Sequence, residues 1–519
     1  MLTSWPRSDA SQNLSIHPTI GSQFMHMQTF TAPSRRRLIQ WMGAAATTEL
    51  LSACGGGGGS GGNAPTSPAP PPTVPPGTTV VNATGSVGSA TGAPLSSRFA
   101  GLSYEKTRLT VPLFSPTNAA FIRLLQRLGP GVLRIGANGV DLSSWSGLVP
   151  GLTPITPAQI DAFAACMQAA GWQVIYGINM ANNTPANAAA EASYVASRLG
   201  SALLAWEIGN EPDLYHSNGD RPSAWSYADY LSEWRTLRSA IAGAAPGVPF
   251  SGPAAAYDTA RFTIPFARDA GAGVPLLTQH YYRANGQDAS STLDLLLTAD
   301  AALPGRLQSL VAAARAAGMA QGFRLAECNS FYNGGAPNIS NAFGTALWVL
   351  DFLFTCAING CTGANLHGGG NGSGYTPIAD SNGTVVAARP EYHGLLMFSL
   401  AASGQARPGV LSVPADFNAS LWGVQRNDGG LNLLLINKDR SRALQATVNT
   451  GAGAAVATSF DPLWLTGTSM DAPTGQQLGG YTVAADGSWQ AQAMAPVTGT
   501  GGSVSVTLPP ATAVLLRST

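Results

Sequence analysis

Two glutamates that follow apolar runs are the residues best placed to do chemistry. Glu211 lies in the segment Ala205–Pro212 (AWEIGNEP), and Glu327 lies in Gly322–Ser330 (GFRLAECNS). Each run has the composition of a buried parallel strand that ends in a polar loop. Retaining glycoside hydrolysis requires two carboxyl groups about 5–5.5 Å apart, one as acid/base and one as nucleophile. The pair therefore indicates a glycosidase, although a single glutamate in a loop would indicate nothing.

Such a pair needs a scaffold that brings strand ends together, and the chain predicts a (β/α)8 TIM barrel over residues 99–403. Apolar strands alternate with Ala-rich amphipathic stretches, which is the pattern of βαβ units in a parallel sheet. Active sites of such barrels lie at the C-terminal ends of the strands. Strands are expected at 99–105, 132–138, 173–178, 205–212, 249–252, 276–280, 322–330 and 363–370, and helices at 116–128, 157–170, 184–199, 222–244, 291–317, 340–358 and 389–402.

A second domain is expected after the barrel. Residues 404–519 change to short alternating strands with turns, which predicts a C-terminal antiparallel β-sandwich. Residues 78–98 are expected to add one or more strands to it. The sandwich could bind carbohydrate or simply pack against the barrel and stabilise it.

The motifs WEIGNEPD and LAECNS resemble the catalytic strands of clan A (β/α)8 retaining glycosidases. They are most similar to the β-glucuronidase and heparanase family, glycoside hydrolase family 79, over about residues 78–519. The resemblance implies that Glu211 is the acid/base after the fourth strand and Glu327 the nucleophile after the seventh. It also implies that Asn210 binds the sugar 2-hydroxyl. The implied reaction is a double displacement on a β-linked glucuronide.

The resemblance extends to other strand ends. His280 and Tyr282 project to one side of the sixth strand, because residues two apart share a face. In the clan a tyrosine at this place orients the nucleophile, although His280 could be a core histidine and Tyr282 a wall residue. On the first two strands, Glu105 and Asn138 are expected to line the sugar subsite.

Arg134 raises a separate expectation. An arginine within a buried strand is costly unless it is paired, so Arg134 should either hold a catalytic carboxylate or form a structural ion pair.

The segment HGGGNGSGY, residues 367–375, replaces the tryptophan that many clan members carry on the eighth strand. Its glycines would leave backbone N–H groups free to converge on an anion. It resembles the loop by which glucuronidases hold the sugar carboxylate, so His367, Gly369 and Tyr375 are expected to bind substrate. A flexible loop without a ligand is the alternative. A neutral-sugar enzyme (β-xylosidase, arabinofuranosidase or β-glucosidase) and a non-catalytic glycan-binding surface lipoprotein also stay open.

Composition and motifs limit the classes of partner and cofactor that we expect. The chain has 519 residues, with 27 Lys and Arg against 27 Asp and Glu, so it carries no electrostatic footprint for nucleic acid. It has no glycine-rich nucleotide fingerprint and no histidine and cysteine spacing typical of zinc. We therefore expect no cofactor and no metal. The expected partner is a β-glucuronide-containing oligosaccharide, polysaccharide or glycoside.

Residues 1–54 have the pattern of an export signal. SRRRLI at 34–39 resembles a twin-arginine signal, and LSAC at 51–54 resembles a lipoprotein cleavage box in which Cys54 would carry lipid. A soluble exported protein with an incidental Cys54 is the alternative. Residues 55–77 form a Gly/Pro-rich linker. The protein is thus expected in the periplasm or cell envelope, on a membrane only through Cys54. A disulfide between Cys356 and Cys361 stays open.

Overall fold

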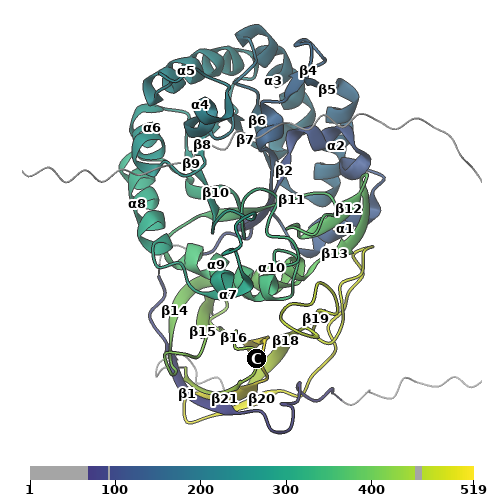
Figure 1. Cartoon of the computed structure of the whole chain (residues 1–519), viewed down its shortest axis with the longest axis vertical. Helices are drawn as coiled ribbons and strands as arrows, with labels where there is room; N and C mark the ends of the chain where they lie inside the picture. The colour runs from purple at the N-terminus through teal and green to yellow at the C-terminus, as the bar shows by residue number, and fades with distance from the viewer. Residues whose placement is uncertain (1–67, 92–93, 451–458) are drawn as a thin grey trace, which may run out of the picture. The chain divides into compact units, whose positions relative to one another are not determined.

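The computed structural model describes residues 68–91, 94–450 and 459–519, which all belong to one compact unit, Thr66–Thr519 (Figure 1). The predicted export signal, Cys54 and most of the Gly/Pro-rich linker lie outside the described residues. None of the described helices combines the length and the apolar character needed to cross a bilayer.

A closed barrel of parallel strands forms the upper part of this unit in Figure 1. Every strand predicted for the barrel is present, and the (β/α)8 fold is confirmed. These strands are almost wholly buried because side chains fill the barrel on one face and helices cover the other. In barrel order they are β10 (Gly322–Asn329), β11 (Gly363–Gly368), β2 (Ala100–Glu105), β3 (Val132–Gly136), β6 (Gln173–Ile178), β7 (Leu203–Ile208), β8 (Phe250–Ala255) and β9 (Leu276–Tyr282).

Helices surround the barrel, and local signals explain their limits. In α2 (Pro157–Ala170), Thr156 and Gln159 form a capping box, proline occupies the first turn and left-handed Gly171 ends the helix. The other α-helices are α1 (Ala119–Arg127), α3 (Pro185–Leu199), α4 (Tyr215–Asn218), α5 (Tyr227–Ala244), α6 (Ile264–Asp269), α7 (Leu293–Leu297), α8 (Leu303–Ala316), α9 (Gly344–Ile358) and α10 (Pro390–Ala401).

Two helix predictions need correction. The helix expected at 291–317 is two helices, α7 and α8, because Thr298 is extended and Pro304 favours the first turn of a new helix. The sequence analysis also missed α6 and the π-helix η6 (Thr259–Thr263) before it, which are too short to show a periodic pattern. The 3-10 helices are η1 (Lys106–Thr110), η2 (Pro112–Phe114), η3 (Asn138–Val140), η4 (Gly200–Ala202) and η5 (Pro212–Leu214), and two small sheets pair β4 (Ser143–Trp145) with β5 (Thr153–Ile155) and β12 (Ile378–Ser381) with β13 (Thr384–Ala388).

The second domain is a β-sandwich whose strands hydrogen bond around a separate core that includes Leu433, Leu435 and Trp464. It differs from the prediction in one pair, because β1 (Val80–Val87) runs parallel to β17 (Ala443–Asn449). No hairpin constrains the direction of β1, since the whole barrel lies between these strands. The other strands are β14 (Gly404–Ser412), β15 (Ala419–Arg426), β16 (Leu431–Asn437), β18 (Ser459–Thr466), β19 (Gln477–Leu478), β20 (Val497–Thr500), β21 (Ser503–Leu508) and β22 (Thr512–Ser518).

A carboxylate on α9 of the barrel makes several contacts with the sandwich. Asp351 on α9 pairs with Lys438 and accepts hydrogen bonds from Ser420 Oγ at 2.5 Å and Trp422 Nε1 at 2.7 Å. The Trp422 ring also stacks on Phe354, with centroids 5.7 Å apart. These contacts support a packing role for the sandwich.

The described cysteines carry free, buried thiols: Cys166, Cys328, Cys356 and Cys361. The bridge between Cys356 and Cys361 is not formed, although the Cys361 backbone N–H donates to the Cys356 carbonyl just beyond the end of α9.

Candidate active site

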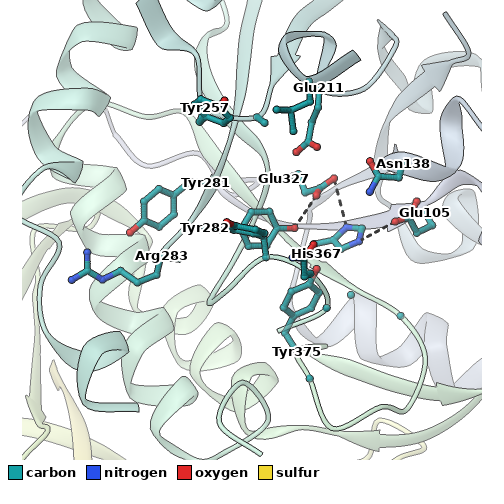
Figure 2. Close-up of a pocket in the computed structure, with 18 of the residues that line it drawn as sticks. Glu105, Asn138, Glu211, Tyr257, Tyr281, Tyr282, Arg283, Glu327, His367 and Tyr375 are labelled. Atoms are coloured by element: carbon teal, nitrogen blue, oxygen red, sulfur yellow. Dashed lines mark hydrogen bonds and ion pairs between the residues drawn. The ribbon is translucent and has the colours of Figure 1, made fainter. Parts of the chain in front are cut away.

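A cavity of about 910 Å³ opens where the barrel strands end (Figure 2). Its lining includes both glutamates and six of the eight predicted substrate-binding residues, namely Glu105, Asn138, Tyr282, His367, Gly369 and Tyr375. The other two, Asn210 and His280, are buried and do not line it. Seven of the eight barrel strands contribute lining residues, either directly or through the segments that follow them, and the exception is β6.

Glu211 and Glu327 face each other across this cavity (Figure 2). One side-chain oxygen of Glu211, one of Glu327 and a ring nitrogen of His280 all lie within 4.8 Å of one another. Glu211 follows β7, and Glu327 lies near the end of β10. These two carboxylate oxygens are thus at most 4.8 Å apart, which fits the close pair of a retaining glycosidase (about 5–5.5 Å) better than the roughly 6.5–9.5 Å of an inverting one.

The backbone after β7 holds Glu211 in an unusual conformation. Its φ and ψ are 50° and 53°, a left-handed arrangement that costs energy in a residue with a side chain. The Glu211 N–H donates to Ala254 O at 2.9 Å. Gly209, two residues before Glu211, has a φ of 78°, and a Cβ at Gly209 would lie 2.5 Å from the Tyr215 hydroxyl. This turn needs glycine, and it aims Glu211 into the cavity.

Asp141 also stabilises the turn that carries Glu211, a role that the sequence analysis did not predict. Its buried carboxylate accepts hydrogen bonds from the backbone of Asn210 at 3.2 Å and from the Tyr215 hydroxyl at 2.7 Å. It also accepts from the backbone of Met180 and Ala181 after β6. A lone aspartate after β3 carried no sequence signal, because its partners lie far away in the chain.

His280 contacts the acid/base candidate. Its Nδ1 lies 2.9 Å from Glu211 Oε1, and its ring is buried. The structure therefore places His280 behind Glu211, where it orients the carboxyl group, and not at the cavity surface where a sugar would bind.

Glu327 is held in the ionised form that a nucleophile requires. Its Oε2 accepts from Arg134 Nη1 at 2.7 Å, and its Oε1 accepts from the Tyr282 hydroxyl at 2.8 Å. Burial alone would raise the pKa of Glu327. Electrostatic interactions with His367, His280 and Arg134, together with the hydrogen bond from Tyr282, outweigh burial and hold that pKa well below its ordinary value.

Arg134 fills both roles that its sequence position allowed. Besides Glu327, its Nε contacts Glu207 Oε1 at 2.5 Å in a fully buried ion pair. Its Nη2 donates to Asn210 Oδ1 at 2.9 Å. The sequence analysis did not predict a role for Glu207. A charged residue in a buried strand needs a partner, and Arg134, two strands away, needed one as well, so the two could have been paired from the sequence.

Asn210 uses its side chain within the protein. Its Oδ1 accepts from Arg134, and its Nδ2 donates to Asn138 Oδ1 at 3.0 Å. Asn138 is the member of this chain of contacts that lines the cavity. Contact between Asn210 and a sugar hydroxyl stays a prediction.

The far side of the cavity from Glu211 combines a histidine, a carboxylate and two tyrosines (Figure 2). His367 Nε2 lies 3.7 Å from Glu105 Oε1, and the His367 and Tyr375 rings meet edge to face at 5.8 Å. Tyr375 in turn stacks on Tyr282 at 5.9 Å. Burial opposes a charge on His367, but Glu327 and Glu105 outweigh it and raise the pKa of His367.

The glycine-rich loop does not leave all its amides free, which corrects the prediction. The Gly369 N–H donates to Thr376 Oγ1 at 2.9 Å, and the Gly370 N–H donates to Asp380 Oδ1 at 2.8 Å. The Tyr375 N–H donates to Gly334 O. These acceptors lie outside the motif, so glycine content alone could not show that the amides were occupied.

Glu211, His280 and Glu327 are close enough to hold a metal ion. However, both Glu327 oxygens already accept hydrogen bonds, and the Arg134 guanidinium lies against one of them. The absence of a metal from the reaction stays a prediction.

Comparison with known proteins bears on this site. No protein-family model matches the chain. A β-glucuronidase of Aspergillus niger is 27% identical over 307 residues, which are 54% of this chain and 56% of that protein. A β-glucuronidase of Neurospora crassa is 28% identical over 236 residues, 40% of this chain and 42% of that protein. The resemblance to β-glucuronidases is confirmed. The chain spans about half the length of the curated relatives it matches.

Solved structures share the fold at lower identity. A 4-O-α-L-rhamnosyl-β-D-glucuronidase from Fusarium oxysporum superposes with a TM-score of 0.69 at 20% identity, covering 83% of this chain and 99% of that one. A GH51 arabinofuranosidase from Xanthomonas axonopodis pv. citri gives 0.63 at 17% identity, covering 85% and 100%. Likeness at this level shows the barrel and its β-sandwich.

Proposed function

We propose that this chain is a retaining glycoside hydrolase that cleaves β-linked glucuronides. The observation that carries the proposal is the carboxyl pair, with oxygens of Glu211 and Glu327 within 4.8 Å of each other. The residues around the pair support different roles for the two glutamates, because Arg134 and Tyr282 stabilise the ionised carboxylate that Glu327 needs as nucleophile. The export and the lipid anchor at Cys54 remain predictions from the sequence.

In the proposed mechanism, Glu327 attacks the anomeric carbon while protonated Glu211 gives its proton to the leaving oxygen. The glycosidic bond breaks, and an ester joins the sugar to Glu327. Glu211, now a carboxylate, takes a proton from water as that water attacks the same carbon and releases Glu327. The His280 contact on Oε1 leaves Glu211 Oε2 available for the moving proton.

The glucuronide as substrate is supported by the two curated relatives, which are both named β-glucuronidase. It is also supported by His367, whose raised pKa favours a positive charge beside Tyr375 where a sugar carboxylate could bind. One observation favours a neutral sugar instead. The backbone N–H groups of Gly369 and Gly370 already donate hydrogen bonds within the protein, so the loop has fewer free N–H donors for an anion than the sequence predicts.

The carboxyl separation predicts retention of configuration. Proton NMR during hydrolysis of 4-nitrophenyl β-D-glucuronide should show β-glucuronic acid first, with the α-anomer appearing only as mutarotation proceeds. The α-anomer as first product would mean that water attacks directly, and would contradict the assignment of Glu327 as nucleophile.

A further inference from the structure

We propose that the N-terminal end of α10, residues 389–391, is a pH-dependent clamp in which Arg389 holds the glycine-rich loop while Glu391 stays uncharged. The inference rests on the proposed function, because that loop carries Tyr375 and borders the cavity in which the cleaved sugar would bind. It adds a reversible control to that function. The clamp opens as the pH rises, and the affinity for substrate falls.

Arg389 ties the start of α10 to the loop through hydrogen bonds. Its Nη1 donates to Gly374 O at 3.0 Å, and its Nη2 donates to Asn371 Oδ1 at 2.9 Å. Its backbone N–H donates to Pro377 O at 2.9 Å, just beyond the loop. A guanidinium is planar and presents several N–H donors in a rigid fork, so it fixes both acceptors relative to the helix. The loop and this end of α10 should therefore move together.

The clamped segment supports one wall of the sugar site. Gly374 precedes Tyr375, whose ring stacks on Tyr282. The other side of the segment rests against backbone, because a Cβ on Gly374 would lie 1.7 Å from the Gly334 carbonyl oxygen. The loop is thus held between Gly334 and the clamp, and release of the clamp would free one side of the Tyr375 wall.

Glu391 is a buried acid without a hydrogen-bond partner. It is 2% exposed, and among the residues that the structure describes neither oxygen of its carboxyl group has a partner. Asn329 lies nearby without the geometry of a hydrogen bond, and its amide instead donates to His367 O at 2.9 Å. A buried charge without donors costs far more than a buried neutral carboxyl group. The closed clamp therefore selects the protonated form of Glu391.

The groups around Glu391 give little compensation for a charge. Tyr104 on β2 and Cys328 on β10 are buried, and burial raises the pKa of each, so both stay neutral. The dipole of α10 favours a negative charge at this end, but its effect is smaller than that of burial. Asn329 and the charge of Arg389 also favour the ionised form. Burial outweighs them and raises the pKa of Glu391 from 4.5 to about 8.

Because the raised pKa belongs to the closed clamp, a rise in pH favours the open one. Below pH 4.5, the ordinary pKa that an exposed Glu391 would have, both forms are protonated and the closed clamp is fully favoured. Between 4.5 and about 8 the open form loses a proton that the closed form keeps. The ratio of closed to open therefore falls about tenfold per pH unit. Above about pH 8 both forms are ionised, and the ratio changes no further.

Hydrogen exchange of the full chain measures this opening without requiring activity. The amides of Gly369, Gly370 and Tyr375 report on the loop, because each donates a hydrogen bond in the closed form. Their exchange is followed by mass spectrometry from about pH 5 to about pH 9 and corrected for the intrinsic rate at each pH. In the wild type, protection should fall about a hundredfold or more up to about pH 8 and then level off.

Variants separate the two residues of the clamp. Glu391→Gln stays neutral at every pH and should keep its protection throughout. Arg389→Met should lose about tenfold of the protection even at low pH, and Arg389→Lys should lose less because it keeps one donor group. Glu233→Gln and Arg315→Met, at sites outside the cavity and away from α10, should behave as the wild type.

The affinity for 4-nitrophenyl β-D-glucuronide should follow the same pH range. Substrate binds the closed form, so an open population raises KM and leaves kcat unchanged. Between about pH 5 and about pH 8 the KM of the wild type should rise at least about threefold more than that of Glu391→Gln, with equal kcat. His367 also loses charge as the pH rises, but it does so in both proteins, so their comparison isolates Glu391.

Other outcomes overturn the proposal. Protection that does not change with pH in the wild type, or a loss of protection that persists in Glu391→Gln, would show that Glu391 does not control the loop. Equal KM values of the two proteins at every pH would show that the clamp does not act on the sugar site. A wild type with the expected exchange that hydrolyses no glucuronide would instead contradict the proposed function, so the two failures are distinguishable.

Discussion

Glu327→Gln is expected to reduce turnover of 4-nitrophenyl β-D-glucuronide by about four orders of magnitude or more. The amide cannot form the ester intermediate, because it is a poor nucleophile. The change keeps the shape of the side chain, and Arg134 stays paired with Glu207. The barrel should therefore remain folded. Initial rates at saturating substrate and the thermal unfolding midpoint measure the two effects separately.

Glu233→Gln provides the matched control. Glu233 pairs with Arg221 outside the cavity, so the substitution should leave turnover unchanged. Turnover of Glu327→Gln within about tenfold of the wild type, with normal folding, would mean that another group attacks the sugar.

Glu211→Gln should produce a loss that depends on the leaving group. A proton from Glu211 is needed most when the leaving oxygen belongs to a sugar, so a glucuronide disaccharide should slow by about 10²–10⁴-fold. An aryl glucuronide with an acidic phenol should slow much less, because nitrophenolate leaves without a proton. Comparison of kcat/KM for the two substrates measures this difference.

Chemical rescue gives a second readout for the same residue. In Glu211→Ala, azide should enter the space left by the carboxylate and attack the ester at Glu327, which restores turnover of the aryl substrate and forms β-glucuronosyl azide. Equal losses on both substrates, with no rescue, would show that Glu211 is not the acid/base.

The barrel could be predicted because its evidence is local. Each strand is an apolar run with a polar end, and helices such as α2 carry a capping residue, a proline and a glycine at the expected places. Predictions failed where local evidence was ambiguous. The stretch 291–317 is amphipathic on both sides of Pro304, so only the structure shows the break. The parallel pairing of β1 depends on a contact across the whole barrel.

The candidate site divides in the same way. Glu211, Glu327 and Tyr282 follow from strand ends and residue spacing, together with the family resemblance. Asp141 could not be predicted, since it accepts hydrogen bonds from backbone N–H groups in segments that only the fold brings near. The same limit explains the glycine-rich loop, whose amides have acceptors beyond the motif.

The measurement that tests the central claim most directly is release of 4-nitrophenol by the full chain from the β-D-glucuronide, the β-D-glucoside and the β-D-xyloside, assayed side by side with Glu327→Gln. Our account predicts turnover of the glucuronide alone, and its loss in the variant. Turnover of the glucoside or xyloside at a rate equal to or above that of the glucuronide would contradict the proposed specificity, and glucuronide turnover that persists in Glu327→Gln would contradict the proposed site.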